Sequence, residues 1–134
     1  MTPTEWITVQ PEAKLLFEIL SEIANREILT PSTIPLDTPL ITACGNLIPG
    51  SVPVHLVPGK SSRSRANVAR LWKDDEITSV GTGWALADDA WHEHTWGVDD
   101  AGIVETTKIQ DHYYGVIFGG ERAEEFLISH RLIW

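Results

Sequence analysis

Apolar residues recur at helical spacing in three stretches of the chain. Residues 11–25 place them on one stripe behind Pro11, which suits the first turn of a helix. A second helix is predicted over residues 64–73 with Ser64 as its N-cap, and a third over residues 121–132. Each stripe predicts a buried face, formed by Leu15, Leu16, Ile19, Leu20 and Ile23 in the first helix, by Val68, Leu71 and Trp72 in the second, and by Ala123, Phe126, Leu127 and His130 in the third.

Residues 77–118 change to an alternation of apolar and polar positions, which is typical of strands. Four strands are predicted, at residues 77–87, 91–98, 103–108 and 113–118, and their short connections make them antiparallel. Before them, residues 30–59 contain six prolines, too many for a helix or a central strand. This part is therefore predicted to be an extended wrapping segment, with residues 52–57 as an edge strand.

The order of these elements predicts an α+β fold. It consists of an N-terminal helix, a proline-rich extended segment, a short helix, an antiparallel β-meander of about four strands and a C-terminal helix. A chain of 134 residues is long enough to bury a core as a single domain. Residues 1–59 then supply the first helix and the wrapping segment, and residues 60–134 the candidate catalytic core.

Composition narrows the function classes. The chain is 43% hydrophobic and 22% charged, as soluble globular proteins are, and its formal charge of −9 argues against a nucleic-acid partner. No apolar run approaches the roughly 20 residues of a membrane span, and the N-terminus lacks the features of a signal peptide. We therefore expect a cytoplasmic protein without a membrane partner. The only cysteine, Cys44, excludes an internal disulfide and is expected to be a small buried side chain.

The segment from residue 91 to residue 107 is predicted to form a hairpin. Residues 99–102 read Asp-Asp-Ala-Gly, a turn signal, and pairing Val98 with Ile103 puts His94 and Glu105 diagonally on one face. Diagonal neighbours lie roughly 7–8 Å apart at the backbone, within side-chain reach. That face is otherwise apolar, so we expect a buried hydrogen-bonded pair of imidazole and carboxylate. Such a pair is either structural or the base of a nucleophilic site.

A nucleophile would decide between these two interpretations. Ser64 stands where the second helix begins, just before the sheet, and a helix N-terminus favours negative charge through its free N–H groups and its dipole. Acyl-transfer enzymes use a nucleophile in this position. Cys44 is an alternative nucleophile.

The order of a nucleophile at a helix start, a histidine on one strand and a carboxylate on the next resembles the papain-like and transglutaminase-like cysteine hydrolases and transferases. More narrowly, the chain is similar to a group of uncharacterised bacterial proteins that read C-H-x-N, G-[WY]-A-L, W-x-x-H-[ST]-W, V-E-T-T and Y-[FY]-G. The matching segments are Ser64-Arg65-Ala66-Asn67, Gly83-Trp84-Ala85-Leu86, Trp91-His92-Glu93-His94-Thr95-Trp96, Val104-Glu105-Thr106-Thr107 and Tyr113-Tyr114-Gly115.

The resemblance implies a papain-like fold over about residues 60–118 and a hydrolase or acyltransferase that attacks an amide or thioester bond. It makes His94 the base, Glu105 its orienting partner, Asn67 a polar support and Ser64 the nucleophile. Serine replaces the cysteine of the pattern, and a hydroxyl depends more strongly than a thiol on its base. The chain is therefore a serine enzyme, a silenced cysteine enzyme or a binding module that kept the pocket.

Two further expectations concern binding. A non-catalytic module would hold a peptide, protein or small acyl compound in a cleft walled by Trp84, Trp91 or Trp96, with Arg65 available for an anionic group. The H-x-H pair of His92 and His94 is the alternative of a metal site, although no third ligand follows at a suitable spacing. The preferred interpretation requires no metal and no cofactor.

Overall fold

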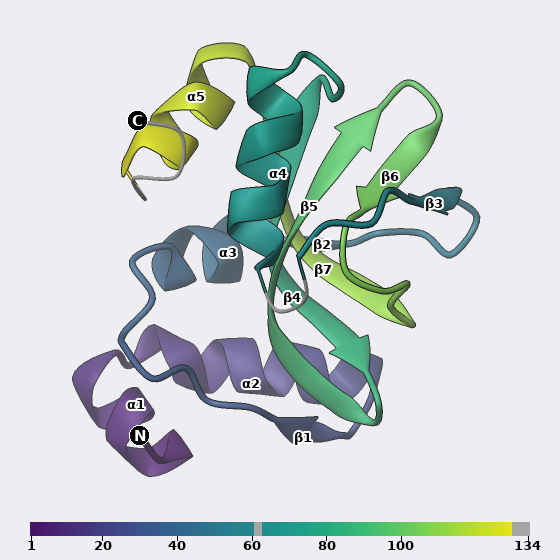
Figure 1. The fold of residues 1–134 in the computed structure, drawn as a ribbon. Helices are drawn as coiled ribbons and strands as arrows, with labels where there is room; N and C mark the ends of the chain where they lie inside the picture. The colour runs from purple at the N-terminus through teal and green to yellow at the C-terminus, as the bar shows by residue number, and fades with distance from the viewer. Residues whose placement is uncertain (61–62, 130–134) are drawn as a thin grey trace.

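A computed structural model describes residues 1–60 and 63–129 of the chain, and these residues form an α+β fold (Figure 1). The α+β class predicted from the sequence is confirmed. The helices are α1 (Pro3–Val9), α2 (Glu12–Ile23), α3 (Thr38–Cys44), α4 (Ser64–Lys73) and α5 (Gly120–Ser129). The strands are β1 (Glu27–Ile28), β2 (Asn46–Leu47), β3 (Val54–Leu56), β4 (Ser79–Ala87), β5 (Ala90–Asp99), β6 (Gly102–Glu105) and β7 (His112–Gly119).

The strands form one mostly antiparallel sheet in the order β2-β7-β4-β5-β6-β3, with β1 beside one end of β5. Strands β4, β5 and β6 follow one another as predicted for a meander. Strand β7 does not extend this meander, because it returns to the free edge of β4. Strand β3 pairs with β6 alone and in parallel, so the predicted edge strand is confirmed.

One face of the sheet carries the main core. All five helices contribute buried apolar side chains to it, and Trp84 and Trp91 meet them from β4 and β5. Helix α2 buries Leu16 and Leu20, as its stripe predicts, but Leu15, which was also predicted to be buried, is 51% exposed. Trp6 of α1 stacks on Trp84 at 5.6 Å between ring centroids. Residues from 1–59 and from 60–134 thus share a single apolar cluster.

The opposite face carries a smaller cluster that the segment around Ile48, Val52 and Val54 packs against. Trp96 lies in it, and a Cβ atom at Gly81 would come within 2.1 Å of the Trp96 indole nitrogen. A glycine is therefore required at position 81. This second face also holds His94 and Glu105, which alternate with the helix-facing residues along β5 and β6.

Several boundaries differ from the sequence predictions. Helices α1 and α3 were not predicted, and α3 lies inside the proline-rich segment. Both are short and carry a proline in the first turn, where its missing N–H needs no partner. Strand β6 ends at Glu105 rather than at residue 108. The third predicted helix begins at Gly120, and its predicted end at residues 130–132, with His130, lies outside the described residues.

Candidate functional site

His94 and Glu105 form a buried pair on the second face of the sheet. The Nε2 atom of His94 lies 2.8 Å from Oε1 and 3.1 Å from Oε2 of Glu105. The two residues are 5% and 0% exposed, so this pair is shielded from solvent. The pairing predicted from the hairpin register is present in the structure, with Val98 opposite Ile103.

Glu105 is surrounded by hydrogen-bond donors. Its Oε2 atom accepts from the backbone N–H of Thr106, the backbone N–H of Thr107 and the Thr107 hydroxyl, each at 3.0 Å. Its Oε1 atom accepts from the Tyr113 hydroxyl at 2.7 Å. An acid surrounded only by donors is held as a carboxylate, so the proton between the pair belongs on Nε2 of His94. When His94 is neutral, its Nδ1 atom then carries the free lone pair.

Opposing effects set the ionisation of these groups. Burial alone would raise the pKa of Glu105, but the hydrogen bond and charge of His94, followed by the bonds from Thr107 and Tyr113, bring that pKa below its usual value. Burial, together with the neighbouring Glu105 carboxylate, raises the pKa of Tyr113 far above its usual value. Tyr113 therefore stays protonated at neutral pH and donates to the Glu105 carboxylate.

The turn at one end of the hairpin holds β5 and β6 in register. Oδ1 of Asp99 accepts from the backbone N–H groups of Ala101 and Gly102, at 2.8 and 3.1 Å. Gly102 has a φ of +135°, which favours glycine, and a Cβ atom there would meet the Pro53 carbonyl at 2.3 Å. Two central residues therefore close the hairpin, as the turn signal indicated, and place Glu105 near His94.

Ser64 approaches the pair from α4. It is the first residue of that helix, and α4 has no side-chain cap, so the predicted N-cap role of Ser64 is wrong. Its hydroxyl instead accepts from the backbone N–H of Thr95 at 3.4 Å. That N–H lies on the edge of β5 before Gly97, which is the first β5 residue that pairs with β6. Among the described residues, no hydrogen bond joins Ser64 to His94.

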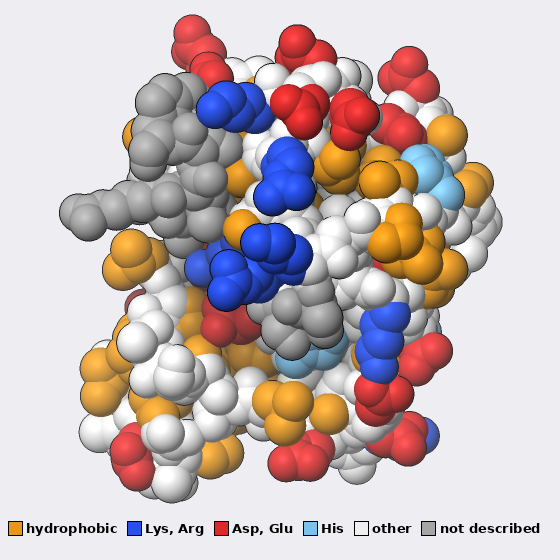
Figure 2. All heavy atoms as spheres, in the orientation of Figure 1, with side chains coloured by type: hydrophobic (Ala, Val, Ile, Leu, Met, Phe, Trp, Pro, Cys, Tyr) orange, Lys and Arg blue, Asp and Glu red, His pale blue; other side chains and the backbone are white. Residues whose placement is uncertain are grey.

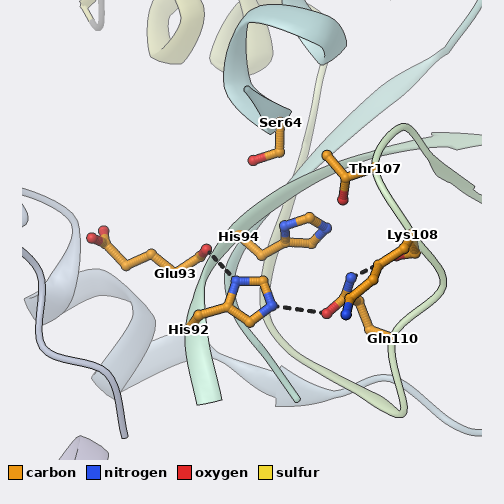
Figure 3. A pocket seen from close by; sticks show the side chains of 7 residues that line it. All are labelled: Ser64, His92, Glu93, His94, Thr107, Lys108 and Gln110. Carbon is orange, nitrogen blue, oxygen red and sulfur yellow. Dashed lines mark hydrogen bonds between the residues drawn. The ribbon is translucent and has the colours of Figure 1, made fainter. Parts of the chain in front are cut away.

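A hollow of about 490 Å³ opens beside Ser64 and the histidines of β5 (Figure 3). Figure 3 shows the Ser64 side chain pointing from the start of α4 toward this hollow, with the His94 ring below it. A second hollow of about 420 Å³ lies on the α4 side and shares Ser64, Glu93 and His94 with the first. The first hollow is lined by Ser64, His92, Glu93, His94, Thr107, Lys108 and Gln110, and the second adds Arg63, Arg65, Ala66 and Thr95.

Asn67 and Arg65 brace the surroundings of the site. Asn67 is buried, exchanges hydrogen bonds with the backbone of Lys60 at 3.0 and 2.8 Å, and donates to the Thr106 hydroxyl at 3.3 Å. Arg65 lies 3.5 Å from Glu93 and 4.0 Å from Asp37. Burial raises the pKa of Glu93, and Arg65 offsets part of this effect. The Arg65 charge is thus already shared between two carboxylates.

The tryptophans do not wall the cleft. Trp84, Trp91 and Trp96 are between 0 and 1% exposed, and none of them lines either of the two hollows beside Ser64. Their large rings fill the two apolar clusters, which corrects the interpretation that a ligand packs on them. Trp96 instead lies behind His94, with ring centroids 6.3 Å apart.

Neither the metal alternative nor the alternative nucleophile gains support from the geometry. No group of three His, Cys, Asp or Glu side chains is arranged for a metal ion in the part of the chain that the structure describes. Cys44 is exposed, which corrects its predicted burial. It lines a separate hollow with Ile48 and Phe118 rather than the one beside His94.

Sequence reasoning missed Tyr113, Gln110 and the role of Thr107. The V-E-T-T motif contained Thr107 two residues after Glu105, so its hydroxyl could have been suggested as a partner. Tyr113 lies on the His94 face of the sheet, but only its pairing with Ala85 of β4 brings it there. Gln110 follows β6 in irregular backbone, where no periodicity predicts its direction.

Comparisons with family models, with curated protein sequences and with solved structures found no match. None of the helices in the described part of the chain has the length and apolar character needed to cross a membrane.

Proposed function

We propose that Ser64, His94 and Glu105 form a papain-like site for hydrolysis or transfer of an acyl group at an amide or thioester bond. The observation that supports this most is the contact of 2.8 Å between Nε2 of His94 and Oε1 of Glu105, since a carboxylate there assigns the proton to Nε2 and leaves the Nδ1 lone pair as a base. A purely structural pair needs no nucleophile beside it, whereas Ser64 and His94 line the same hollow.

In the proposed reaction the Ser64 oxygen attacks the carbonyl carbon of the substrate, and its proton passes to Nδ1 of His94. Glu105 stabilises the imidazolium that forms. The N–H groups in the first turn of α4 are suited to hold the negative oxygen of the tetrahedral intermediate. His94 then returns the proton to the departing nitrogen or sulfur, and water or another acceptor releases the acyl group from Ser64.

This reaction requires Ser64 to donate to His94, and no such hydrogen bond is present among the described residues. Catalytic hydrogen bonds are often longer before substrate binds and tighten in the complex. The Thr95 N–H occupies one acceptor position of the Ser64 oxygen and leaves the hydroxyl proton available. A small rotation of the Ser64 side chain would direct this proton to the hollow that His94 lines.

Replacing Ser64 with cysteine tests the proposal, because a thiol reports its own activation. The variant is made in a Cys44→Ser background, since Cys44 is exposed and would also react. Alkylation by iodoacetamide at pH 7 should be about tenfold faster than for a free cysteine, which is only a few per cent ionised at that pH. His94→Gln in the same background should remove this acceleration. A thiol at position 64 that reacts like a free cysteine contradicts the proposal.

The second candidate function is a non-catalytic binding module that uses the same two hollows. It is favoured by the serine at position 64 and by the missing hydrogen bond between Ser64 and His94. A module of this kind would hold a peptide, protein or small acyl compound and leave it unchanged. It predicts that ligand binding survives His94→Ala, and a loss of all binding in that variant counts against it.

A further inference from the structure

His92 is the second histidine of the site and was not assigned a role in the proposed reaction. It lines the same hollow as Ser64 and His94, and its ring centroid lies 5.2 Å from that of His94 (Figure 3). Its Nδ1 atom is 3.0 Å from the backbone carbonyl oxygen of Glu93, and its Nε2 atom is 2.8 Å from Oε1 of Gln110. Both ring nitrogens therefore have a protein partner.

The orientation of the Gln110 amide follows from its other contact. Its nitrogen donates to the carbonyl oxygen of Lys108 at 2.5 Å, and a carbonyl oxygen only accepts. The Gln110 oxygen must then face His92. Gln110 is 6% exposed, and its backbone N–H donates to the Tyr113 hydroxyl at 3.4 Å, so the residue is held at both ends.

The Glu93 carbonyl also accepts only. On this edge of β5, the Trp91 carbonyl accepts from Leu29, and pairing with β6 begins at Gly97. Glu93 lies between these two positions. Sheet pairing therefore leaves this carbonyl free on the open edge of the strand, and His92 is its hydrogen-bond partner among the described residues. Both nitrogens of His92 face acceptors, and an imidazole can donate from both only as an imidazolium.

We infer that His92 is a positioning residue that works as a cation beside the nucleophile. A neutral ring would lose one of its two hydrogen bonds and bring two lone pairs together. This positive charge favours the anion of the nucleophile at position 64, a role that rests on the proposed function. His92 touches no reacting atom, since Gln110 and Glu93 occupy both of its nitrogens.

Other charges face His92 from the surrounding elements. His94 and Glu93 neighbour it on β5, and Lys108 lines the same hollow from the segment after β6. Lys108 pairs with Asp88 of the turn between β4 and β5, and the pKa of Asp88 is lowered, most by the Lys108 hydrogen bond and least by the charge of His92. The charge of Lys108 is therefore compensated by Asp88, while neither hydrogen-bond partner of His92 is charged.

The test measures the pH dependence of alkylation at position 64, in the Ser64→Cys, Cys44→Ser background. Iodoacetamide forms a C–S bond with the thiolate and releases iodide. His92→Gln removes the charge and should move the midpoint of the rate profile up by about 0.5–1 pH unit, as expected when a unit charge is removed from a solvated cleft. His92→Arg should retain most of the low midpoint. His112→Gln is the matched control, because His112 stacks on Trp91 on the other face.

A midpoint that His92→Gln leaves unchanged, in a variant whose thiol is activated through His94, overturns the inference and spares the proposed function. The ring nitrogens of His92 give a second readout that needs no reaction. In ¹⁵N spectra of the unmodified chain at pH 7, both should carry protons. A single protonated nitrogen at that pH overturns the inference, including the case in which the thiol at position 64 is unreactive.

Discussion

The two faces of the sheet are both buried, yet they are built in different ways. The helix-covered face is held by apolar contacts among large side chains, with Trp84 and Trp91 at its centre. The other face buries a carboxylate and an imidazole, and satisfies them with Thr107, Tyr113 and backbone N–H groups. Strand β5 supplies residues to both faces, since neighbouring residues of a strand point to opposite faces.

This difference separates stability from chemistry in one small fold. Apolar contacts have no required direction, so the helix-covered face can stabilise the chain without fixing any reactive atom. Hydrogen bonds to a buried carboxylate are directional, so the other face fixes the proton on one nitrogen of His94. Exposed charges follow a third pattern, and Figure 2 shows Lys and Arg side chains gathered over α4 and the segment before it.

The largest loss of stability is expected from a substitution on the helix-covered face. Trp84→Ala removes a fully buried ring that stacks on Trp6, and should lower the free energy of unfolding by about 3–5 kcal/mol. Urea denaturation measures this loss. The tautomer of His94 should not change while the variant is folded. An altered His94 ring spectrum in folded Trp84→Ala would mean that the two faces are coupled.

The next largest loss of stability is expected on the face that holds His94 and Glu105. Glu105→Gln replaces a carboxylate that accepts from five donor groups, and should cost about 2–3 kcal/mol at pH 7. Folding lowers the pKa of Glu105 below its usual value of 4.5, so its stabilisation is complete above pH 4.5 and is lost as the pH falls through the lower folded value. The stability difference between the two proteins should shrink in acid. A difference that stays constant down to pH 2 contradicts the assigned ionisation.

A smaller loss is expected from Tyr113→Phe, which keeps the ring and removes only the hydroxyl. Glu105 loses one donor and the Gln110 N–H loses its acceptor, for about 1–2 kcal/mol in the free energy of unfolding. The pKa of Glu105 should rise, because a bond that favours the carboxylate is gone. Carboxyl ¹³C shifts followed over a pH titration measure it. An unchanged Glu105 titration would show that Tyr113 only fills space.

The smallest loss of stability is expected at the turn between β5 and β6, which lies outside both faces. Asp99→Ala removes two hydrogen bonds to turn amides and the contact with His55 at 3.1 Å, all of them partly solvated. We expect a loss of about 0.5–1 kcal/mol, measured by thermal unfolding. Asp99→Asn serves as a control, since its side-chain oxygen still accepts from the turn. If both variants unfold alike, these bonds contribute nothing measurable.

The sequence predicts the elements that depend on local pattern. The stripe of α2, the strands β4 to β7 and the hairpin at residue 99 follow from periodicity and turn chemistry, and the hairpin register alone brings His94 to Glu105. Sequence patterns did not reveal α3, because its proline at the first turn reads as a helix breaker unless the helix start is known.

Long-range pairing limits the prediction of the site. Tyr113 reaches Glu105 because β7 returns to β4, and no local pattern specifies this return. The tryptophans near the histidines suggested a cleft wall, yet alternation places Trp91 on the face opposite His92, and Trp96 is covered by the segment around Val52. Gln110 and its contact with His92 depend on irregular backbone, which follows no period.

In the proposed site, Glu105 holds the proton of His94 on Nε2 and leaves Nδ1 as the base toward residue 64. Long-range ¹H–¹⁵N spectra of the histidine rings measure this directly in the unmodified protein. We expect neutral His94 to carry its proton on Nε2, and we expect this preference to weaken in Glu105→Gln. A neutral His94 protonated on Nδ1 would rule out this assignment, because no lone pair would then face Ser64.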